Sequence, residues 1–190
     1  RSLFEPLKCV KDGQFLDNMN RYDTIFVDIQ AQFAIAQFEK ENPTRFISRN
    51  IVRELQEEYP DIALGGMALM NAVSRIYHET GSQFVIIFDE WDYPIRELAE
   101  GSGERSDYIE LLRGLFKNSD AKEYIRLAYL TGIMPIVRKK GQSAVNNFME
   151  YTMTNPMDLA QDIGFTEEEV YLLCKRFGVD FEQMKEWYNG

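Results

Sequence analysis

The chain is poor in histidine and cysteine. Only one histidine, His78, and two cysteines, Cys9 and Cys174, occur among the 190 residues. With a single imidazole, a histidine-based metal site or a Ser-His-Asp triad is disfavoured. The two cysteines lie at opposite ends of the sequence and match neither a zinc-ligand spacing nor a disulfide framework. We therefore expect reduced thiols in a cytoplasmic protein, and a structural place for His78 in the last turn of a helix that Gly81 ends.

Positive charge is also scarce. The sequence holds 21 Lys and Arg against 31 Asp and Glu, which gives a formal net charge of −10. Sequence-independent binding to nucleic acid depends on clustered Lys and Arg that displace counterions from the phosphates. We therefore expect no direct nucleic-acid binding by this chain. No apolar stretch approaches the 18 or so residues of a membrane-spanning helix, so we expect no membrane segment either.

The sequence lacks the phosphate-binding motif G-x-x-x-x-G-K-[ST]. Its nearest glycine-containing runs, Gly101-Ser-Gly103 and Lys139-Lys-Gly141, do not have the order that lets backbone amides and a lysine hold phosphates. The chain also begins at Arg1 without an initiator methionine. We expect an internal segment of a longer protein, in which any such loop lies upstream of Arg1.

The most informative feature is an apolar run, Phe84-Val-Ile-Ile-Phe88, followed directly by Asp89 and Glu90. A run this short and rich in β-branched and aromatic residues predicts a strand of a parallel sheet, buried on both faces. The carboxylates then lie at the carboxyl end of the strand, where ligands bind in open α/β sheets.

An adjacent Asp and Glu at that edge have the pattern of a Walker B motif. A hydrolase of Mg-nucleotides needs one carboxylate to hold the metal and another to orient and deprotonate the attacking water. We assign Asp89 to Mg²⁺ and Glu90 to the water. The alternative is a buried strand that ends in two solvated acidic side chains.

Two further segments, residues 23–29 and 126–133, have the composition of strands. Helical periodicity separates each of them from the Phe84 strand, so the three most economically form one parallel sheet with right-handed crossovers. The predicted class is α/β. The third strand ends in Thr131 followed by Gly132. A small hydroxyl residue at this point is typical of a sensor for the γ-phosphate.

Helical patterns cover residues 44–59 and 66–79, and a third helix is expected after a polar loop over 102–107. Ser106 or Asp107 is the predicted cap of that third helix, because Ser and Asp accept hydrogen bonds from the first free amides.

The character of the sequence changes after Asn146. Thr166-Glu-Glu-Glu169 is a capping box, Gly178 ends the helix that it begins, and Asp180 begins another. We therefore divide the chain into an α/β core over residues 1–145 and a C-terminal helical extension over 146–190. The extension is expected to be a helical lid or a winged-helix-like appendage.

Several stretches of the chain resemble, in order, the bacterial AAA-ATPase-like domain family, whose members often carry a downstream PD-(D/E)XK nuclease-like domain. The stretches are Asp89-Glu-Trp-Asp92, Tyr129-Leu-Thr-Gly-Ile-Met-Pro-Ile136, Ser143-Ala-Val-Asn146, Tyr151-Thr-Met-Thr-Asn-Pro156, Gly164-Phe-Thr-Glu-Glu-Glu-Val170 and Lys185-Glu-Trp-Tyr-Asn-Gly190. The resemblance implies a P-loop NTPase fold of the additional-strand type, which would use ATP and Mg²⁺ in the full-length protein.

By that resemblance Asp89 and Glu90 match the Walker B pair and Thr131 matches the sensor. Arg138 follows the sensor strand together with two lysines, where a basic residue could approach phosphate; the alternative is a solvated loop. Asn146 matches a position that the family pattern favours, either to fix a turn or to contact the nucleotide.

Two functions remain open on the sequence. The chain is either part of an ATP hydrolase or a catalytically idle scaffold, a protein-interaction module associated with a nuclease-like domain. Without a phosphate-loop strand, interior strands of the sheet would become edges that can pair with another chain. Self-association or a protein partner is therefore expected.

Overall fold

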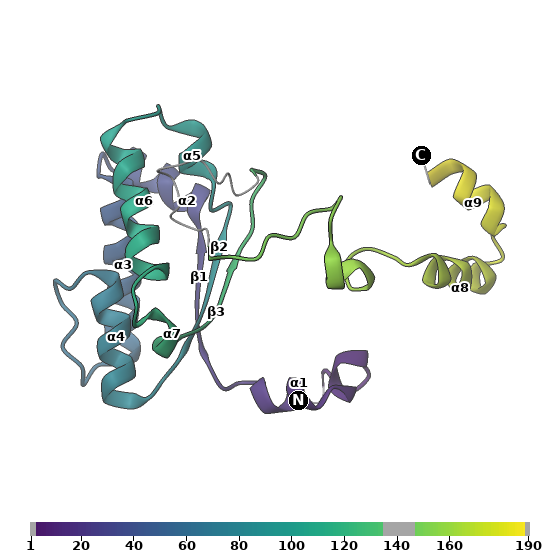
Figure 1. The fold of residues 1–190 in the computed structure, drawn as a ribbon, viewed down its shortest axis with the longest axis horizontal. Helices are drawn as coiled ribbons and strands as arrows, with labels where there is room; N and C mark the ends of the chain where they lie inside the picture. Colours follow the sequence, from purple (N-terminus) through teal and green to yellow (C-terminus); the bar gives the residue numbers. More distant parts are fainter. Residues whose placement is uncertain (1–2, 135–146, 189–190) are drawn as a thin grey trace. The chain divides into compact units, whose positions relative to one another are not determined.

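The computed structural model describes residues 3–134 and 147–188 of the chain (Figure 1). The chain divides into two compact units, Arg1–Phe148 and Met149–Gly190.

The first unit is built on a parallel sheet of three strands in the order β1-β2-β3. They are β1 (Asp23–Asp28), β2 (Phe84–Asp89) and β3 (Ile125–Leu130). The predicted α/β class and the parallel sheet are confirmed. Two strands end earlier than predicted. β1 stops at Asp28 because its side chain caps the next helix by accepting a hydrogen bond from the backbone N–H of Ala31.

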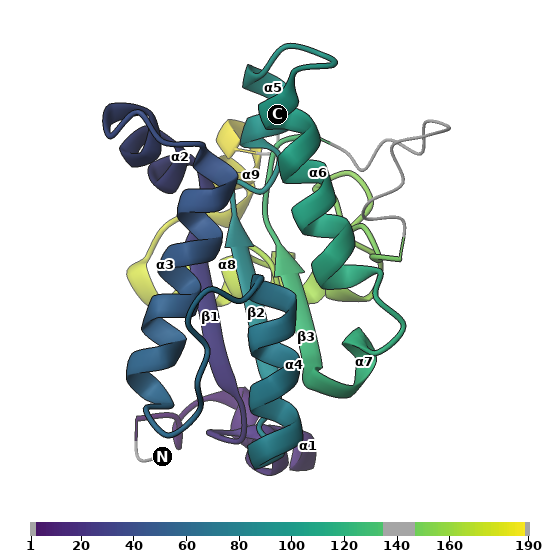
Figure 2. The same cartoon turned by 90° about the vertical axis from the view of Figure 1, so that its left-hand side faces the viewer.

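The helices that connect the strands pack on one face of the sheet, as Figures 1 and 2 show for α3, α4 and α6. The elements are η1 (Lys8–Lys11) and α1 (Gly13–Asn18) before β1; α2 (Ile29–Phe38), α3 (Pro43–Glu58) and α4 (Leu69–Thr80) between β1 and β2; and α5 (Tyr93–Glu97), α6 (Gly103–Phe116) and α7 (Ala121–Tyr124) between β2 and β3. Both crossovers step in the same direction across the sheet. Because such crossovers are right-handed, both place their helices on the same face.

Local sequence accounts for several of the helix ends. The side chain of Asn42 accepts a hydrogen bond from the backbone N–H of Arg45, and Pro43 occupies the first turn of α3. Gly81 ends α4 in the left-handed conformation with φ 78°, as predicted.

The predicted start of α6 is wrong. The helix begins at Gly103 and its cap is Ser102, whose hydroxyl oxygen accepts a hydrogen bond from the backbone N–H of Arg105. Ser106 lies in the first turn and donates its hydroxyl to the Ser102 carbonyl oxygen. Asp107 instead accepts a hydrogen bond from the amide group of Asn42.

The core lies between the sheet and the helices. Phe84, Ile86 and Phe88 of β2 are fully buried there. Fully or almost fully buried side chains from the helices meet them, among them Phe33, Ile47, Leu69, Ala72, Val73, Ile76, Tyr108, Leu112 and Leu115. At roughly 1.5–3 kcal/mol for each large apolar side chain, this layer supplies the main favourable term in folding.

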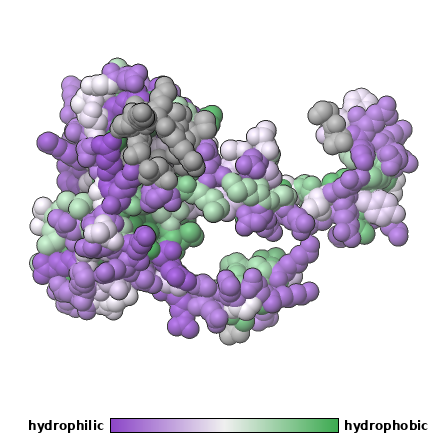
Figure 3. Space-filling model, in the orientation of Figure 1, coloured by the Kyte–Doolittle hydropathy of each residue, from purple (hydrophilic) through white to green (hydrophobic). Residues whose placement is uncertain are grey.

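The opposite face of the sheet is uncovered in the described part of the first unit. Phe26 is 61% exposed, Leu127 55% and Tyr129 54%, and Val85 and Ile87 are only partly buried. Apolar surface accordingly gathers over the strands (Figure 3). The prediction that β2 is buried on both faces is therefore wrong for this second face, although parallel sheets are normally covered on both.

The second unit is helical and contains η2 (Met157–Gln161), α8 (Glu167–Phe177) and α9 (Phe181–Tyr188). The predicted capping box of α8 is confirmed, with Thr166 and Glu169 bonded reciprocally. Asp180 accepts a hydrogen bond from the backbone N–H of Gln183 at the start of α9. Across the helices that the structure describes in both units, none has the length and apolarity that a bilayer span requires.

Candidate functional site

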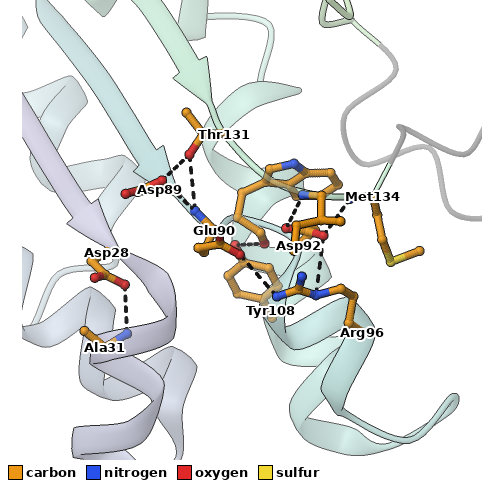
Figure 4. Close-up of polar contacts among 11 residues, drawn as sticks. Asp28, Ala31, Asp89, Glu90, Asp92, Arg96, Tyr108, Thr131 and Met134 are labelled. Atoms are coloured by element: carbon orange, nitrogen blue, oxygen red, sulfur yellow. Dashed lines mark hydrogen bonds and ion pairs between the residues drawn. The ribbon is translucent and has the colours of Figure 1, made fainter. Parts of the chain in front are cut away.

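The three strands end at one edge of the sheet with polar side chains in a row. Asp28 is the register partner of Asp89, and Thr131 follows the strand residue that pairs with Phe88. Neighbouring strands are about 4.8 Å apart, and every second side chain points to the same face. Asp28, Asp89 and Thr131 therefore share the uncovered face of the sheet (Figure 4).

Thr131 joins Asp89, the last residue of β2, to Glu90, which follows it. Its hydroxyl donates a hydrogen bond to Asp89 Oδ1, and its oxygen accepts one from the backbone N–H of Glu90 at 3.3 Å. The same backbone N–H lies 3.1 Å from Asp89 Oδ1. The structure thus brings together Asp89, Glu90 and Thr131 from the ends of two separate strands.

The backbone of Glu90 is in the left-handed region, with φ 52°. Non-glycine residues seldom adopt this conformation, which costs on the order of 1–3 kcal/mol and persists where the surroundings enforce it. Here the neighbouring Trp91 donates its backbone N–H to the carbonyl oxygen of Thr131 at 3.0 Å, which holds the turn against the end of β3. The turn directs the Glu90 side chain away from Asp89 and toward α5 (Figure 4).

Arg96 on α5 lies between two carboxylates. Its Nη2 is 3.2 Å from Glu90 Oε2, and its Nε is 3.6 Å from Asp92 Oδ2. The Arg96 side chain is 20% exposed and that of Glu90 34%, so this ion pair is only partly screened by water. Arg96 therefore fixes where the Glu90 carboxylate points.

Asp92 is completely buried and links α5 to the segment after β3. Its carboxylate accepts hydrogen bonds from the backbone N–H groups of Met134 at 2.8 Å and Ile133 at 3.4 Å. A Cβ atom at Gly132 would lie 2.9 Å from the Asp92 carboxyl carbon, so the close approach depends on glycine. Burying a carboxylate is tolerated here because amide donors and a guanidinium surround it.

Tyr108 of α6 supports the turn that contains Glu90 and Trp91. Its hydroxyl donates a 2.7 Å hydrogen bond to the carbonyl oxygen of Trp91. Burial, and next the negative charge of Asp92, raise the pKa of Tyr108 well above its usual value of 10. Tyr108 therefore stays protonated and remains a hydrogen-bond donor at physiological pH.

Comparison with protein families gives one match. The AAA-ATPase-like family, described as a predicted AAA-ATPase, matches residues 1–140. The chain belongs to this family. Comparisons with curated proteins and with solved structures each found no match. The matched AAA-ATPase-like segment includes all three strands of the sheet together with Asp89, Glu90 and Thr131.

Two residues of this cluster, Asp28 and Arg96, were not predicted from the sequence. Asp28 could have been found because it ends a second parallel strand, and the carboxyl ends of parallel strands meet at one edge. Arg96 could have been found from its spacing of four residues after Asp92, which places the two on one side of a helix.

Two residues predicted from the sequence fall in the stretch between residues 134 and 147. Arg138 and Asn146, expected to contact the nucleotide, lie outside the described residues, as do Lys139 and Lys140.

The row of side chains suits Mg²⁺ only in company with a bound phosphate. Over residues 3–134 and 147–188, no group of three or more His, Cys, Asp or Glu side chains is gathered to hold a metal by itself. Mg²⁺ is commonly held by one or two carboxylates, with waters and substrate phosphates completing its ligands. Asp89, with Asp28 beside it, fits this requirement, as expected of a family that in general uses nucleotide and Mg²⁺.

Proposed function

We propose that this chain forms the Walker B and sensor part of a site that binds Mg-ATP and hydrolyses ATP in a longer protein. The observation that carries the proposal is the meeting of Asp89, Glu90 and Thr131 at the carboxyl edge of the sheet. Mg²⁺, when bound, neutralises charge that develops on the phosphates. We propose that Asp89 holds the ion, together with Asp28, which lies beside Asp89.

Three further side chains of the site have distinct roles in this proposal. Glu90 accepts the proton of the attacking water. The Thr131 hydroxyl, which donates to Asp89 here, would donate instead to the γ-phosphate when nucleotide is bound. Arg96 holds the Glu90 carboxylate in position through the 3.2 Å ion pair.

The sheet has room for the phosphate-binding part. A further parallel strand could pair with the free edge of β3. If that strand came before β1 in the chain, the connection from it to β1 would cross the sheet in the direction opposite to the crossovers β1–β2 and β2–β3. Right-handed crossover then puts its helix on the uncovered face that carries Phe26 and Tyr129. The loop after that strand would meet Asp89 where the strand order reverses, which is where ligands bind in such sheets. We propose that a phosphate-binding strand, loop and helix of the longer protein occupy this place.

The substitution Asp89→Asn tests this function. In a longer protein that contains the upstream segment, the change is expected to weaken Mg-ATP binding by about tenfold or more, because it removes a negative charge next to the ion. Isothermal titration with ATP, with and without Mg²⁺, measures the effect. For the 190 residues alone, binding is expected to be weak, since the phosphate loop supplies most phosphate contacts in this class.

The matched control is Asp61→Asn, the same chemical change at an exposed aspartate in the loop after α3. It is expected to leave Mg-ATP affinity unchanged. Equal affinities for Asp89→Asn and the unsubstituted protein would show that Asp89 does not hold the metal.

The uncovered apolar face of the sheet favours one alternative. In that alternative the chain is a catalytically idle scaffold that binds other protein segments, associated with a nuclease-like domain in the longer protein. Substitutions at Asp89 and Glu90 would then leave ATP turnover unchanged.

In either case we propose a cytoplasmic protein. We also propose that this chain does not contact nucleic acid directly, because its net charge is −10.

A further inference from the structure

A groove of about 720 Å³ lies on the helical side of the first unit. It runs between α3 and α6, with residues 65–68 and the first turn of α4 at its base. Figure 2 shows these three helices facing the viewer, in front of the strands. The lining residues from α3 extend from Thr44 to Gln56, a length of about 18 Å at 1.5 Å per residue.

The floor of the groove is apolar and adaptable. The apolar side chains that line it are Val52, Met67, Ala68, Leu69, Met70, Leu111 and Leu115. Methionine has a flexible, polarisable side chain that adjusts to different partners. Gly114 widens the floor, because a Cβ atom there would lie 2.9 Å from the Sδ atom of Met70.

One wall of the groove carries a row of arginines. Arg45, Arg49 and Arg53 all line it, and their spacing of four residues places them on one stripe of α3. Arg49 forms an ion pair with Glu41 at 2.7 Å. The side chains of Arg45 and Arg53 have no hydrogen-bond or ion-pair partner within residues 3–134 and 147–188.

This concentration of positive charge is unusual for the chain. Like charges four residues apart on a helix repel one another. The chain has 31 acidic residues, yet the groove is lined by three arginines and only one carboxylate, that of Glu110. The carboxylate of Glu110 is itself paired with Arg113 at 2.5 Å. Within the residues that the structure describes, Arg45 and Arg53 thus lack the paired carboxylate that Arg49 has in Glu41.

We propose that this groove binds an amphipathic helix of a partner protein, with acidic side chains directed at the arginine row. A helix in a groove is anchored by apolar residues at positions i, i+3 or i+4 and i+7. About 18 Å corresponds to about 12 helical residues, or a little over three turns. The apolar floor takes the anchors, and Arg45 and Arg53 pair with the acidic flank.

A synthetic peptide tests the proposal on the 190-residue chain. The probe is a fluorescein-labelled 14-residue helix with leucines at positions 3, 6, 10 and 13 and glutamates along one flank. A second peptide has lysine in place of each glutamate. Fluorescence anisotropy is expected to detect saturable binding of the acidic peptide, at least about tenfold tighter than the lysine peptide and weaker as salt is added.

The double variant Arg45→Glu/Arg53→Glu is expected to lose about tenfold or more of the affinity for the acidic peptide, with an unchanged circular dichroism spectrum. The control Lys11→Glu/Lys122→Glu makes the same change in net charge at exposed positions outside the groove and is expected to keep the affinity. Equal binding of both peptides, or equal losses in the two double variants, would overturn the proposal. A dimer seen by light scattering that dissociates only in the arginine variant would also overturn it, because the occupant would then be a second copy of the chain.

Discussion

Replacement of Glu90 by glutamine is expected to slow ATP hydrolysis by about 10²- to 10⁴-fold in a longer protein that contains this chain and the phosphate loop. Glutamine keeps the size of the side chain and can still accept a hydrogen bond from Arg96, so the fold and the Mg-ATP affinity should be retained. It cannot take a proton from water at neutral pH. Steady-state turnover and nucleotide titration on the same preparation separate the two effects.

The control for this substitution is Glu97→Gln, the same chemical change at an exposed glutamate on α5. Turnover should be unchanged in that variant. If Glu90→Gln turned over ATP as fast as the unsubstituted protein, Glu90 would not be the base. The pair with Asp89 would then be a solvated strand end or part of an idle scaffold.

Replacement of Asp92 by alanine is expected to destabilise the first unit by about 3–5 kcal/mol. The change leaves the largely buried guanidinium of Arg96 without its inner partner and removes the acceptor for the backbone N–H groups of Ile133 and Met134. At about 2–4 °C per kcal/mol for a domain of this size, the midpoint of thermal unfolding should fall by roughly 6–20 °C. Urea unfolding followed by circular dichroism gives the free energy of unfolding directly.

The exposed position Asp61 supplies the comparison, since Asp61→Ala should change stability by no more than about 0.5 kcal/mol. Asp92→Asn should fall between the two because its amide oxygen still accepts a hydrogen bond. A loss below about 1 kcal/mol for Asp92→Ala would mean that the segment after β3 is held by other contacts.

Local patterns in the sequence predict part of this structure well. The apolar run before Asp89 identifies β2, Gly81 marks the end of α4, and Thr166 with Glu169 marks the start of α8. In each case the deciding interactions lie within a few residues, so the sequence window contains them.

Other features depend on contacts between distant segments. The α6 cap illustrates this, because Ser102, Ser106 and Asp107 are all acceptable caps and the packing of the helix selects among them. The alignment of Asp28 with Asp89 requires the register of two strands more than 50 residues apart. The sequence of β2 likewise does not reveal whether a helix covers each face of the sheet.

The site residues likewise divide into those that local sequence predicts and those that depend on contacts between distant segments. Asp89 and Glu90 are adjacent in sequence, so their pairing was visible, and Thr131 followed from the end of the next strand. The partnership of Glu90 with Arg96 was not visible because it depends on the left-handed backbone at Glu90, which turns the side chain toward α5. The nucleotide contacts of Arg138 and Asn146 stay predictions.

The shared register of the three strands also determines where this chain can change in length. Removal of one residue within β2 would shift its pairing by one position and rotate Asp89 from the uncovered face into the helical layer. Insertions between α3 and α4, or between α5 and α6, would leave the register intact, because lengthening a surface connection costs little. Proteins that share this site should therefore differ in length in those connections, and keep constant the number of residues from the start of each strand to Asp28, Asp89 and Thr131.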